Sequence, residues 1–264
     1  MIDVALERVP DEPGWVDTRG MLLSGRAQVA FSQEPEAAAD GFVVWVPDAA
    51  LMSIVGRPPA SLIVEIAGSL DGDVNALCQF ADAAHVGSAL SQWQRTVAVL
   101  HTLRSRAEWE DGTEHDTRIF FADNAPPLGH VPARLRNELV NALKGRTIAR
   151  FVPGELPDRD LPPPLEPTPI AASFTKGLPV SFCYPVVRTE RWWDVSIETI
   201  PEHRRHGYAI RAIRAMTRHM WESGRSPVWG AAIGNVPSLT LAHGLGFREV
   251  SRLCVFSSVE SESF

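Results

Sequence analysis

The sequence predicts an α+β protein of two domains, and three observations support this fold class. The chain has 264 residues, which is longer than most single domains. Its hydrophobic content of 45% and charged content of 22% are typical of a globular chain with a substantial core. Runs of β-branched and aromatic residues alternate with segments of helical periodicity on both sides of a proline-rich stretch.

The proline-rich stretch marks the predicted domain boundary. Proline lacks a backbone N–H and fixes φ, which excludes both a helix and an inner strand from residues 153–167. We therefore expect an α+β N-terminal domain at residues 1–152, a linker at residues 153–167 and a second domain at residues 168–257. Apart from this stretch, the sequence shows no internal repeat.

The first domain is predicted to mix both kinds of element. The expected strands are Phe42–Val46, Thr117–Ala122 and Thr147–Val152, and the expected helices are Ala60–Ala67, Asp73–Ala84, Leu90–Arg104 and Pro132–Lys144. The acidic residues between positions 108 and 116, together with Trp93 and Trp109, form either a cation site or a solvated loop.

The second domain is predicted to begin with three strands and then to alternate. The expected strands are Ile170–Lys176, Leu178–Arg188, Trp192–Ile200, Pro227–Ala232 and Arg248–Phe256, and the expected helices are Tyr208–Ser223 and Ser238–Leu245. Gly177 joins the first two strands, and Gly246 ends the second helix.

Charge and cysteine content exclude several classes of protein. The net charge of −7 argues against a general nucleic-acid-binding protein. Residues 1–166 hold 14 basic and 24 acidic residues, a balance of −10, whereas residues 167–264 hold 11 and 8, a balance of +3. The second half is thus suited to an anion, and the first half faces either a cation or water. Three cysteines in no close pair predict no disulfide framework, and no apolar run suggests a membrane span or secretory signal, so we expect a cytoplasmic protein.

The segment from Ile197 to Ala209 contains the motif that indicates the chemistry of the protein. A strand ends, a tight turn follows, and a helix begins with a glycine at position 207. Such a helix start offers unpaired backbone N–H groups and the positive end of the helix dipole, and glycine lets an anion approach closely. The pattern predicts a pyrophosphate-binding loop.

Two motifs in this half resemble those of the GNAT superfamily of acyl-CoA-dependent N-acetyltransferases. Arg204, Gly207 and Ala209 match the Gln/Arg-x-x-Gly-x-Gly/Ala loop of that family. A second signature follows as Asn235, Ser238, Leu241, Gly246 and Phe247. The local sequences at residues 180–184, 197–199 and 227–232 look most like those of the zwittermicin A resistance type of GNAT protein. The resemblance covers about residues 168–256 and implies a mixed central sheet flanked by helices.

This resemblance implies acetyl-CoA as cosubstrate and assigns residues to it. Backbone groups of Ile197 and Thr199 would pair with the pantetheine arm. The pyrophosphate would lie on the loop that carries Arg204, against the amides of Arg205, His206, Gly207, Tyr208 and Ala209. Asn235, with Ser238 beside it, would reach the pantetheine arm, although an asparagine at this position is also a good helix cap.

Acetyl transfer needs a free amine, so a base is expected near the cofactor loop. Glu198 is the leading candidate because its strand position favours partial burial and hence a raised pKa. Its alternative role is a solvated carboxylate or an ion-pair partner of Arg204, and Asp194 and Ser196 are the alternate bases on the same strand face. The position where many relatives carry a tyrosine acid is Ala242, which leaves Ser238, His243, Tyr184 or water to protonate the thiolate.

The remaining expectations concern ligands and function class. His203 and His206 offer no third ligand at a standard spacing, so no metal is expected. Cys183 and Cys254 are expected to pack in the core. The leading hypothesis is an N-acetyltransferase of a small, cationic amine, with an amino-bearing antibiotic as one acceptor class. An acyl-CoA sensor without turnover and a protein-directed acetyltransferase are the alternatives, and the oligomeric state is not predicted.

Overall fold

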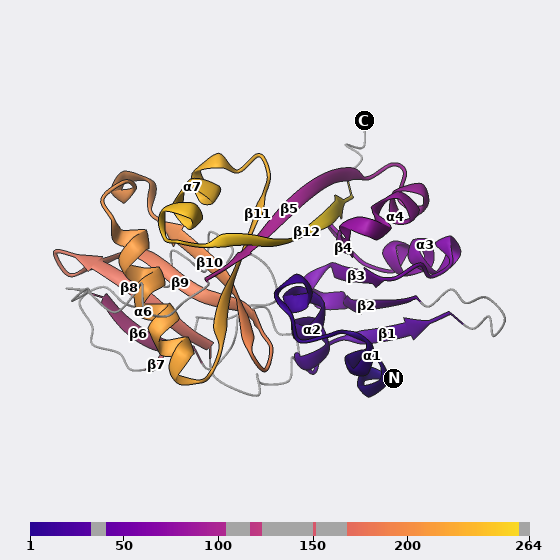
Figure 1. Ribbon diagram of the computed structural model, residues 1–264, viewed down its shortest axis with the longest axis horizontal. Coiled ribbons are helices and arrows are strands. Elements are labelled where there is room, and N and C mark those ends of the chain that lie inside the picture. Colours follow the sequence, from indigo (N-terminus) through magenta and orange to yellow (C-terminus); the bar gives the residue numbers. More distant parts are fainter. Residues whose placement is uncertain (33–40, 104–116, 123–149, 152–167, 259–264) are drawn as a thin grey trace.

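The computed structural model describes residues 1–32, 41–103, 117–122, 150–151 and 168–258. These residues form a twelve-stranded sheet with helices on both faces (Figure 1). The helices are α1 (Ile2–Arg8), α2 (Val16–Leu23), α3 (Ala60–Gly68), α4 (Ala83–Ala89), α6 (Tyr208–Glu222) and α7 (Val236–Gly244). The strands are β1 (Gln28–Phe31), β2 (Phe42–Val46), β3 (Leu51–Val55), β4 (Asn75–Gln79), β5 (Gln94–Thr102), β6 (Thr117–Ala122), β7 (Arg150–Phe151), β8 (Thr168–Thr175), β9 (Leu178–Arg188), β10 (Trp192–Thr199), β11 (Ser226–Ala232) and β12 (Arg248–Ser257).

The two halves of the chain exchange a strand at the centre of this sheet. The strand order is β1-β2-β3-β4-β12-β5-β11-β10-β9-β8-β6-β7. The last strand of the second half, β12, pairs with β4 of the first half, and β5 of the first half pairs with β11 of the second. Figure 1 shows β5 and β12 running side by side across the middle of the molecule. The predicted domains therefore share one continuous sheet.

The same order of elements occurs twice. Three antiparallel strands, a helix, a parallel strand, a second helix and an exchanged strand make up β1 to β5, and the same series makes up β8 to β12. In each half the parallel pair joins the third strand to the fourth, β3 to β4 and β10 to β11. The sequence predicts no internal repeat, so this repetition is one of topology alone.

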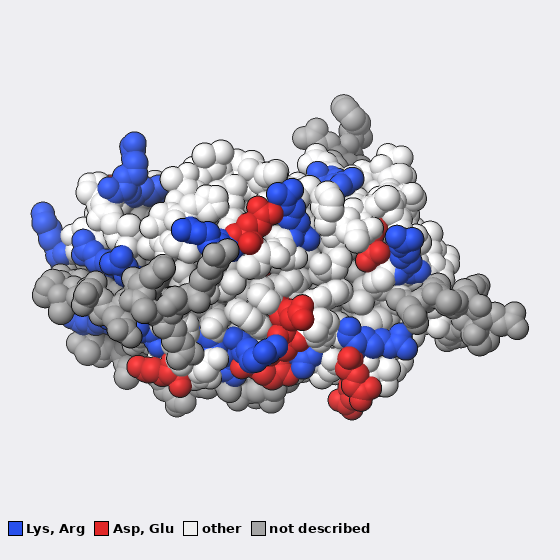
Figure 2. Space-filling model, in the orientation of Figure 1, with Lys and Arg blue, Asp and Glu red and all other residues white. Residues whose placement is uncertain are grey.

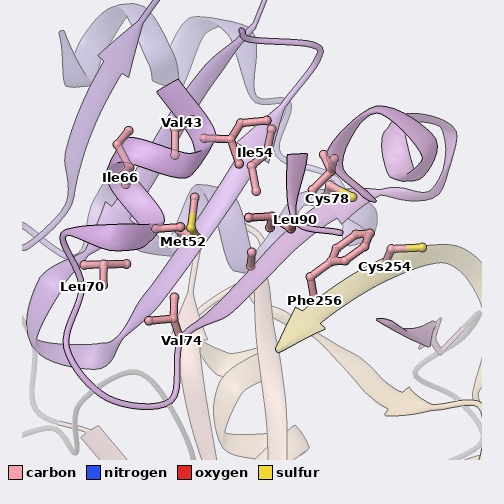
Figure 3. Close-up of a cluster of buried hydrophobic side chains, with 14 of the residues drawn as sticks. Val43, Met52, Ile54, Ile66, Leu70, Val74, Cys78, Leu90, Cys254 and Phe256 are labelled. Atoms are coloured by element: carbon pink, nitrogen blue, oxygen red, sulfur yellow. The ribbon is translucent and has the colours of Figure 1, made fainter. Parts of the chain in front are cut away.

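Three apolar clusters fill the space between the sheet and the helices. One lies under α1 and α2 and draws on both halves, with Val44, Leu100, Val187 and Val228 among its buried members. The opposite face carries a cluster under α3 and α4, shown in Figure 3, and another under α6 and α7. Strand alternation explains the division, because successive side chains point to opposite faces of the sheet.

Helix α2 belongs to the first half but packs against both. Its Thr18 hydroxyl lies 2.8 Å from the hydroxyl of Ser53 in β3. On the other side, Arg19 donates to both carboxylate oxygens of Glu190, at 2.6 and 2.8 Å, in the turn between β9 and β10. A Cβ placed on Gly20 would lie 2.6 Å from the Cβ of Val187 in β9. The helix thus contacts the strands of the second half very closely.

Two helices predicted in the first half are wrong. Residues of the predicted helix Asp73–Ala84 form β4, a short 3-10 helix at Phe80–Asp82 and only the start of α4, and those of Leu90–Arg104 form β5. Buried and partly buried residues alternate along β4, as in a strand. In β5 the backbone finds partners in both β11 and β12. This long-range pairing outweighs local helical periodicity, which is a weak signal by itself.

The other predicted elements agree well with the structure. The α+β class is confirmed, and Phe42–Val46, Thr117–Ala122 and Leu178–Arg188 are strands with the predicted bounds. In the second half every predicted element forms, with ends that differ by at most two residues. The predicted helix Pro132–Lys144, the acidic run at 108–116 and the linker at 153–167 lie outside the described residues, as does all but residues 150–151 of the strand Thr147–Val152.

Candidate functional site

The parallel strands β10 and β11 separate part-way along their length. Their pairing runs from Trp192 and Ser226 to Asp194 and Val228 and then stops. Beyond this point β10 stays paired with β9, whereas β11 stays paired with β5. We call the two diverging segments, residues 195–199 and 229–232, the fork.

The fork leaves backbone groups of β10 directed to its open side. The Ile200 N–H donates to the Val180 carbonyl of the neighbouring chain segment, and the Ser181 hydroxyl donates to the Glu198 carbonyl at 3.0 Å. Because backbone groups point alternately to the two sides of a strand, those of Ile197 and Thr199 point away from β9. The Thr199 carbonyl accepts a hydrogen bond from Arg204 Nε at 3.2 Å. The predicted pantetheine-binding groups are therefore on the open edge of β10.

A solvent-exposed turn connects β10 to α6. His206 Nδ1 lies 2.7 Å from the Arg204 carbonyl, and Arg205 and Gly207 adopt positive φ angles of 62° and 79°. Gly207 is the N-cap of α6, and a Cβ placed on it would meet no atom within 4 Å. The N–H groups of the first helical turn have no partner within the helix. The turn thus presents donors and positive charge at an uncrowded position, as an anion site requires.

Helix α6 is held in place by its apolar side. Ile213, Met216 and Met220 are buried in the cluster beneath it. The guanidinium of Arg211 lies 4.8 Å from the centre of the Tyr208 ring, so this arginine covers the first turn of the helix.

Asn235 and Ser238 lie at the start of α7, on the β11 side of the fork. The Asn235 side-chain oxygen accepts a hydrogen bond from the Ser238 N–H at 3.3 Å, which caps the helix. The Ser238 hydroxyl accepts a hydrogen bond from Trp229 Nε1 at 2.9 Å. Ala242, at the position where many relatives have tyrosine, is fully buried beside Phe247. The motif residues therefore stabilise the helix that follows β11.

The predicted bases lie along β10. Trp193 and Val195 pack under α6, which places Asp194, Ser196 and Glu198 on the opposite face of the strand. Ser196 is buried, whereas Glu198 and Asp194 are partly buried. Glu198 lies next to the cofactor loop, and Asp194 lies where the fork opens. Tyr184 is buried opposite Ser196 on β9.

Solved structures with this arrangement cover most of the chain. A GCN5-related N-acetyltransferase-like protein from Streptococcus suis has a TM-score of 0.60 at 13% identity, covering 98% of this chain and 100% of its own. A GCN5-related N-acetyltransferase from Kribbella flavida has a TM-score of 0.54 at 12% identity, covering 94% and 95%. A putative GNAT-family acetyltransferase from Novosphingobium aromaticivorans has a TM-score of 0.52 at 13% identity, covering 83% and 89%.

The sequence itself matches the GNAT acetyltransferase family over residues 172–256. This segment is similar to the GNAT family, and it includes the fork, the turn before α6, and α7. No curated protein matches the sequence. The solved structures share the fold of this chain.

A second carboxyl group, which no sequence motif indicates, acts on Asp194. Asp17 in the first turn of α2 shares a helix face with Gly20 and Met21, the face packed on the second half. Burial raises the pKa of Asp17 to about 6. A helix N-terminus by itself lowers an aspartate pKa, by up to about one unit, so burial is the stronger effect here.

The pKa of Asp194 is also raised well above its ordinary value. Burial is the main cause, and the negative charge of Asp17 adds to it. Backbone N–H groups of Val195 and Gly230 act in the opposite direction by donating to the carboxylate. Two partly buried carboxyls with raised proton affinity thus lie together where the fork opens.

A pair of histidines lies between α7 and β5. His243 Nε2 of α7 is 3.2 Å from Nε2 of His101, a buried residue of β5. Burial lowers the pKa of His101, and the neighbouring His243 lowers it further, so His101 favours the neutral form. His101 comes from the first half of the chain, and only the strand exchange brings it here.

No group of three or more His, Cys, Asp or Glu among the described residues is placed to hold a metal ion. None of their helices is long and apolar enough to cross a membrane. Cys78, Cys183 and Cys254 are free and buried in the core, and burial raises the pKa of Cys78 to about 12. On the face shown in Figure 2, acidic and basic side chains are interspersed on a largely uncharged surface.

Proposed function

We propose that this protein is an acyl-CoA-dependent N-acyltransferase that transfers an acetyl group from acetyl-CoA to a small, cationic amine. The observation that carries the proposal is the open edge of β10 followed by the exposed, glycine-initiated start of α6. An extended thioester arm can pair with the first, and a pyrophosphate can bind the second. The match to the GNAT family over residues 172–256 supports the same assignment.

The cosubstrate would be held mainly by backbone groups. Ile197 and Thr199 would pair with the amide groups of the pantetheine arm, as one strand pairs with another. The N–H groups that follow Gly207 would receive the pyrophosphate, with Arg204, Arg205 and His206 supplying donors and positive charge around it. Asn235 and Ser238 would support the arm from the β11 side.

The chemistry requires the acceptor nitrogen to lose protons. An alkyl ammonium has a pKa near 10.4, so forming the free amine at pH 7 requires about 4 to 5 kcal/mol. Glu198, Asp194 and Ser196 line the face of β10 on which a base would be needed. The amine then attacks the thioester carbonyl, the C–N bond forms, the C–S bond breaks and the thiolate leaves. Ser238, His243, Tyr184 or the substrate nitrogen itself would supply its proton, because Ala242 has no hydroxyl.

The acceptor is proposed to be cationic because the first half of the chain is acidic in composition and two carboxyl groups act on each other where the fork opens. Residues 1–166 carry a net charge of −10, and their helix α2 brings Asp17 to Asp194. We place the reaction in the cytoplasm, with no metal, nucleic-acid or membrane partner. An amino-bearing antibiotic, as for the zwittermicin A resistance type, is the first acceptor class to test.

The proposal is tested by thiol release from acetyl-CoA in the presence of small amines, including aminated antibiotics, and of basic peptides. Turnover with a small amine supports it. Turnover with peptides alone would indicate a protein-directed enzyme. Tight CoA binding measured by calorimetry without any turnover would indicate a sensor, which the buried Ala242 in place of tyrosine favours as the second candidate.

The role of Glu198 is tested by Glu198→Gln. If Glu198 takes the proton, kcat/KM falls by roughly 10² to 10⁴ and the acidic limb of the pH profile moves, while CoA affinity stays unchanged. Glu65→Gln, an exposed glutamate of α3, is the matched control and should leave both quantities unchanged. A Glu198→Gln enzyme with the wild-type rate and profile would remove this residue from the mechanism.

A further inference from the structure

The point where β10 and β11 part brings together carboxyl groups from both halves of the chain. Asp194 is the last β10 residue paired with β11. The charge of Asp17 in α2 acts on Asp194, and Gly20, one helical turn further along α2, packs directly on Val187 of β9. Within the described residues, neither carboxylate forms an ion pair with an arginine, lysine or histidine, although Arg19, two positions from Asp17, is paired with Glu190.

The Asp194 carboxyl lies beside an exposed glycine of the neighbouring strand. A Cβ placed on Gly230 of β11 would lie 3.2 Å from Leu100 Cδ2 and 3.8 Å from Asp194 Oδ1, so a larger residue would crowd this position. Asp194 itself is only partly buried, which leaves part of its side chain accessible to an incoming group. The backbone N–H of Gly230 lowers the pKa of the same carboxylate, opposite to the effects of burial and of Asp17.

We infer that Asp17 and Asp194 act as one proton-sharing pair that takes the proton from the ammonium group of the acceptor, with Asp194 as the catalytic base and Asp17 as the residue that positions and tunes it. This inference rests on the proposed acyl transfer. The acceptor is then a primary or secondary amine that enters as its ammonium ion, because a paired carboxyl site with no protein cation of its own attracts a substrate cation.

The proton balance of the step is complete. An N–H bond of the ammonium breaks, its electron pair stays on nitrogen, and an O–H bond forms on Asp194. The neutral amine attacks the thioester carbonyl, and the departing thiolate takes the second proton that the nitrogen loses. Asp194 then returns its proton to water. Two carboxyls that lie together hold one proton more tightly than either would alone, which suits a base working near neutral pH.

The groups that face the pair from neighbouring elements are few. Asp17 is the charged side chain that acts on Asp194 from α2, and the Cys183 thiol lies near it on β9. Burial and the Asp194 charge both raise the pKa of Cys183, so this thiol stays neutral. Among the described groups that act on Asp194, only Asp17 carries a charge.

The test measures each carboxyl in the absence of the other. Carboxyl carbons of ¹³C-labelled aspartate are titrated by NMR in the wild type, in Asp17→Asn and in Asp194→Asn. If the pair shares a proton, Asp194 titrates at lower pH in Asp17→Asn than in the wild type, and Asp17 titrates at lower pH in Asp194→Asn. Asp3→Asn, which removes an exposed carboxylate from the adjacent helix α1, should move neither. Unchanged titration of both residues would overturn the inference.

The kinetic readout separates positioning from catalysis. With an active amine, Asp17→Asn should move the acidic limb of the kcat/KM profile to lower pH by about one unit, because a neutral neighbour no longer raises the proton affinity of Asp194. Asp194→Asn should lower kcat by 10² or more while CoA affinity is kept. An Asp17→Asn profile that coincides with the wild type would contradict the pairing. If no amine is acylated by the wild type, the proposed function fails, and the NMR titration still decides whether the pair exists.

Discussion

At the scale of single residues, Gly207 combines two properties that a binding loop needs. Its φ of 79° lies in the left-handed region that favours glycine, and the space where a side chain would be is empty. The helix that follows depends on its buried side, not on the loop, for stability. The loop is thus free to serve a ligand.

Gly207→Val should weaken CoA binding by tens of fold or more. The added side chain occupies the approach of the pyrophosphate, and loss of two charge-assisted hydrogen bonds costs about 1.5 to 3 kcal/mol each. Gly224→Val is the matched control, because Gly224 has a φ of 81° and equally open surroundings just past the other end of α6. Calorimetry should show the loss only for Gly207→Val. Equal losses in both variants would indicate backbone strain instead of a binding loop.

Asp17 also gives a residue-scale prediction about stability and pH. Its pKa is about 6 in the folded protein, against an ordinary value of 3.8, so the folded state holds this proton more tightly than the unfolded chain. The protonated Asp17 carboxyl contributes to the free energy of unfolding. This contribution is fully present below about pH 4 and is lost as pH rises through about 6. Asp17→Asn, which has no titrating carboxyl at this position, should not lose stability in this way as pH rises.

Thermal unfolding from pH 4 to pH 7 checks that prediction. The Tm of Asp17→Asn relative to wild type should improve by several degrees as pH rises across this range, whereas Asp3→Asn should show a constant difference. A constant difference for Asp17→Asn would mean that Asp17 keeps its ordinary pKa in the folded protein.

At the scale of elements, α2 acts as a clamp between the halves. Gly20 allows the helix to lie against β9 at a distance that any side chain would increase. The ion pair of Arg19 with Glu190 and the bond of Thr189 to Asp11, at 2.6 Å, hold the adjoining turn. This packing is what brings Asp17 to the fork.

Gly20→Ala should therefore destabilise the protein although alanine favours helices. A Cβ 2.6 Å from that of Val187 forces the helix or strand to move, and overpacking of this kind costs about 1 to 3 kcal/mol. Gly68→Ala, in exposed surroundings at the end of α3 with no atom within 4 Å, should be neutral or slightly stabilising. Urea unfolding midpoints of the two variants should move in opposite directions. A stabilised Gly20→Ala would show that α2 does not pack closely on β9.

At the scale of the whole molecule, the exchange of β5 and β12 makes the halves interdependent. Without β5, β11 and β12 would each lose a partner strand, and without β12, β4 and β5 would do so. Unpaired edges of that length are costly and prone to aggregation. The chain is therefore expected to unfold as one cooperative unit.

Cutting the chain within residues 153–167 should leave the two pieces bound to each other. A site-specific protease sequence inserted there allows a single cleavage, since this proline-rich segment is predicted to be an exposed linker. The fragments should coelute in size-exclusion chromatography and separate only in denaturant, because the exchanged strands hold them together. Separation under native conditions would mean that each half folds independently.

The sequence by itself determined the α+β class, every strand and α-helix of residues 168–257, and the glycine at the start of α6. These features are local, because a glycine at a helix start and alternation along a strand leave their mark within a few residues. The close agreement of the predicted and observed ends of β9 and α6 reflects this.

Only the tertiary structure decided that Asn75–Gln79 and Gln94–Thr102 are strands and that the topology repeats. It also decided that the charge of Asp17 acts on Asp194. Each depends on partners far away in the chain. Strand β5 exists because β11 and β12 complete its hydrogen bonds, and Asp17 matters because α2 packs across the seam. The local sequence does not predict such partners, since the free energy that selects them comes from long-range strand pairing and burial.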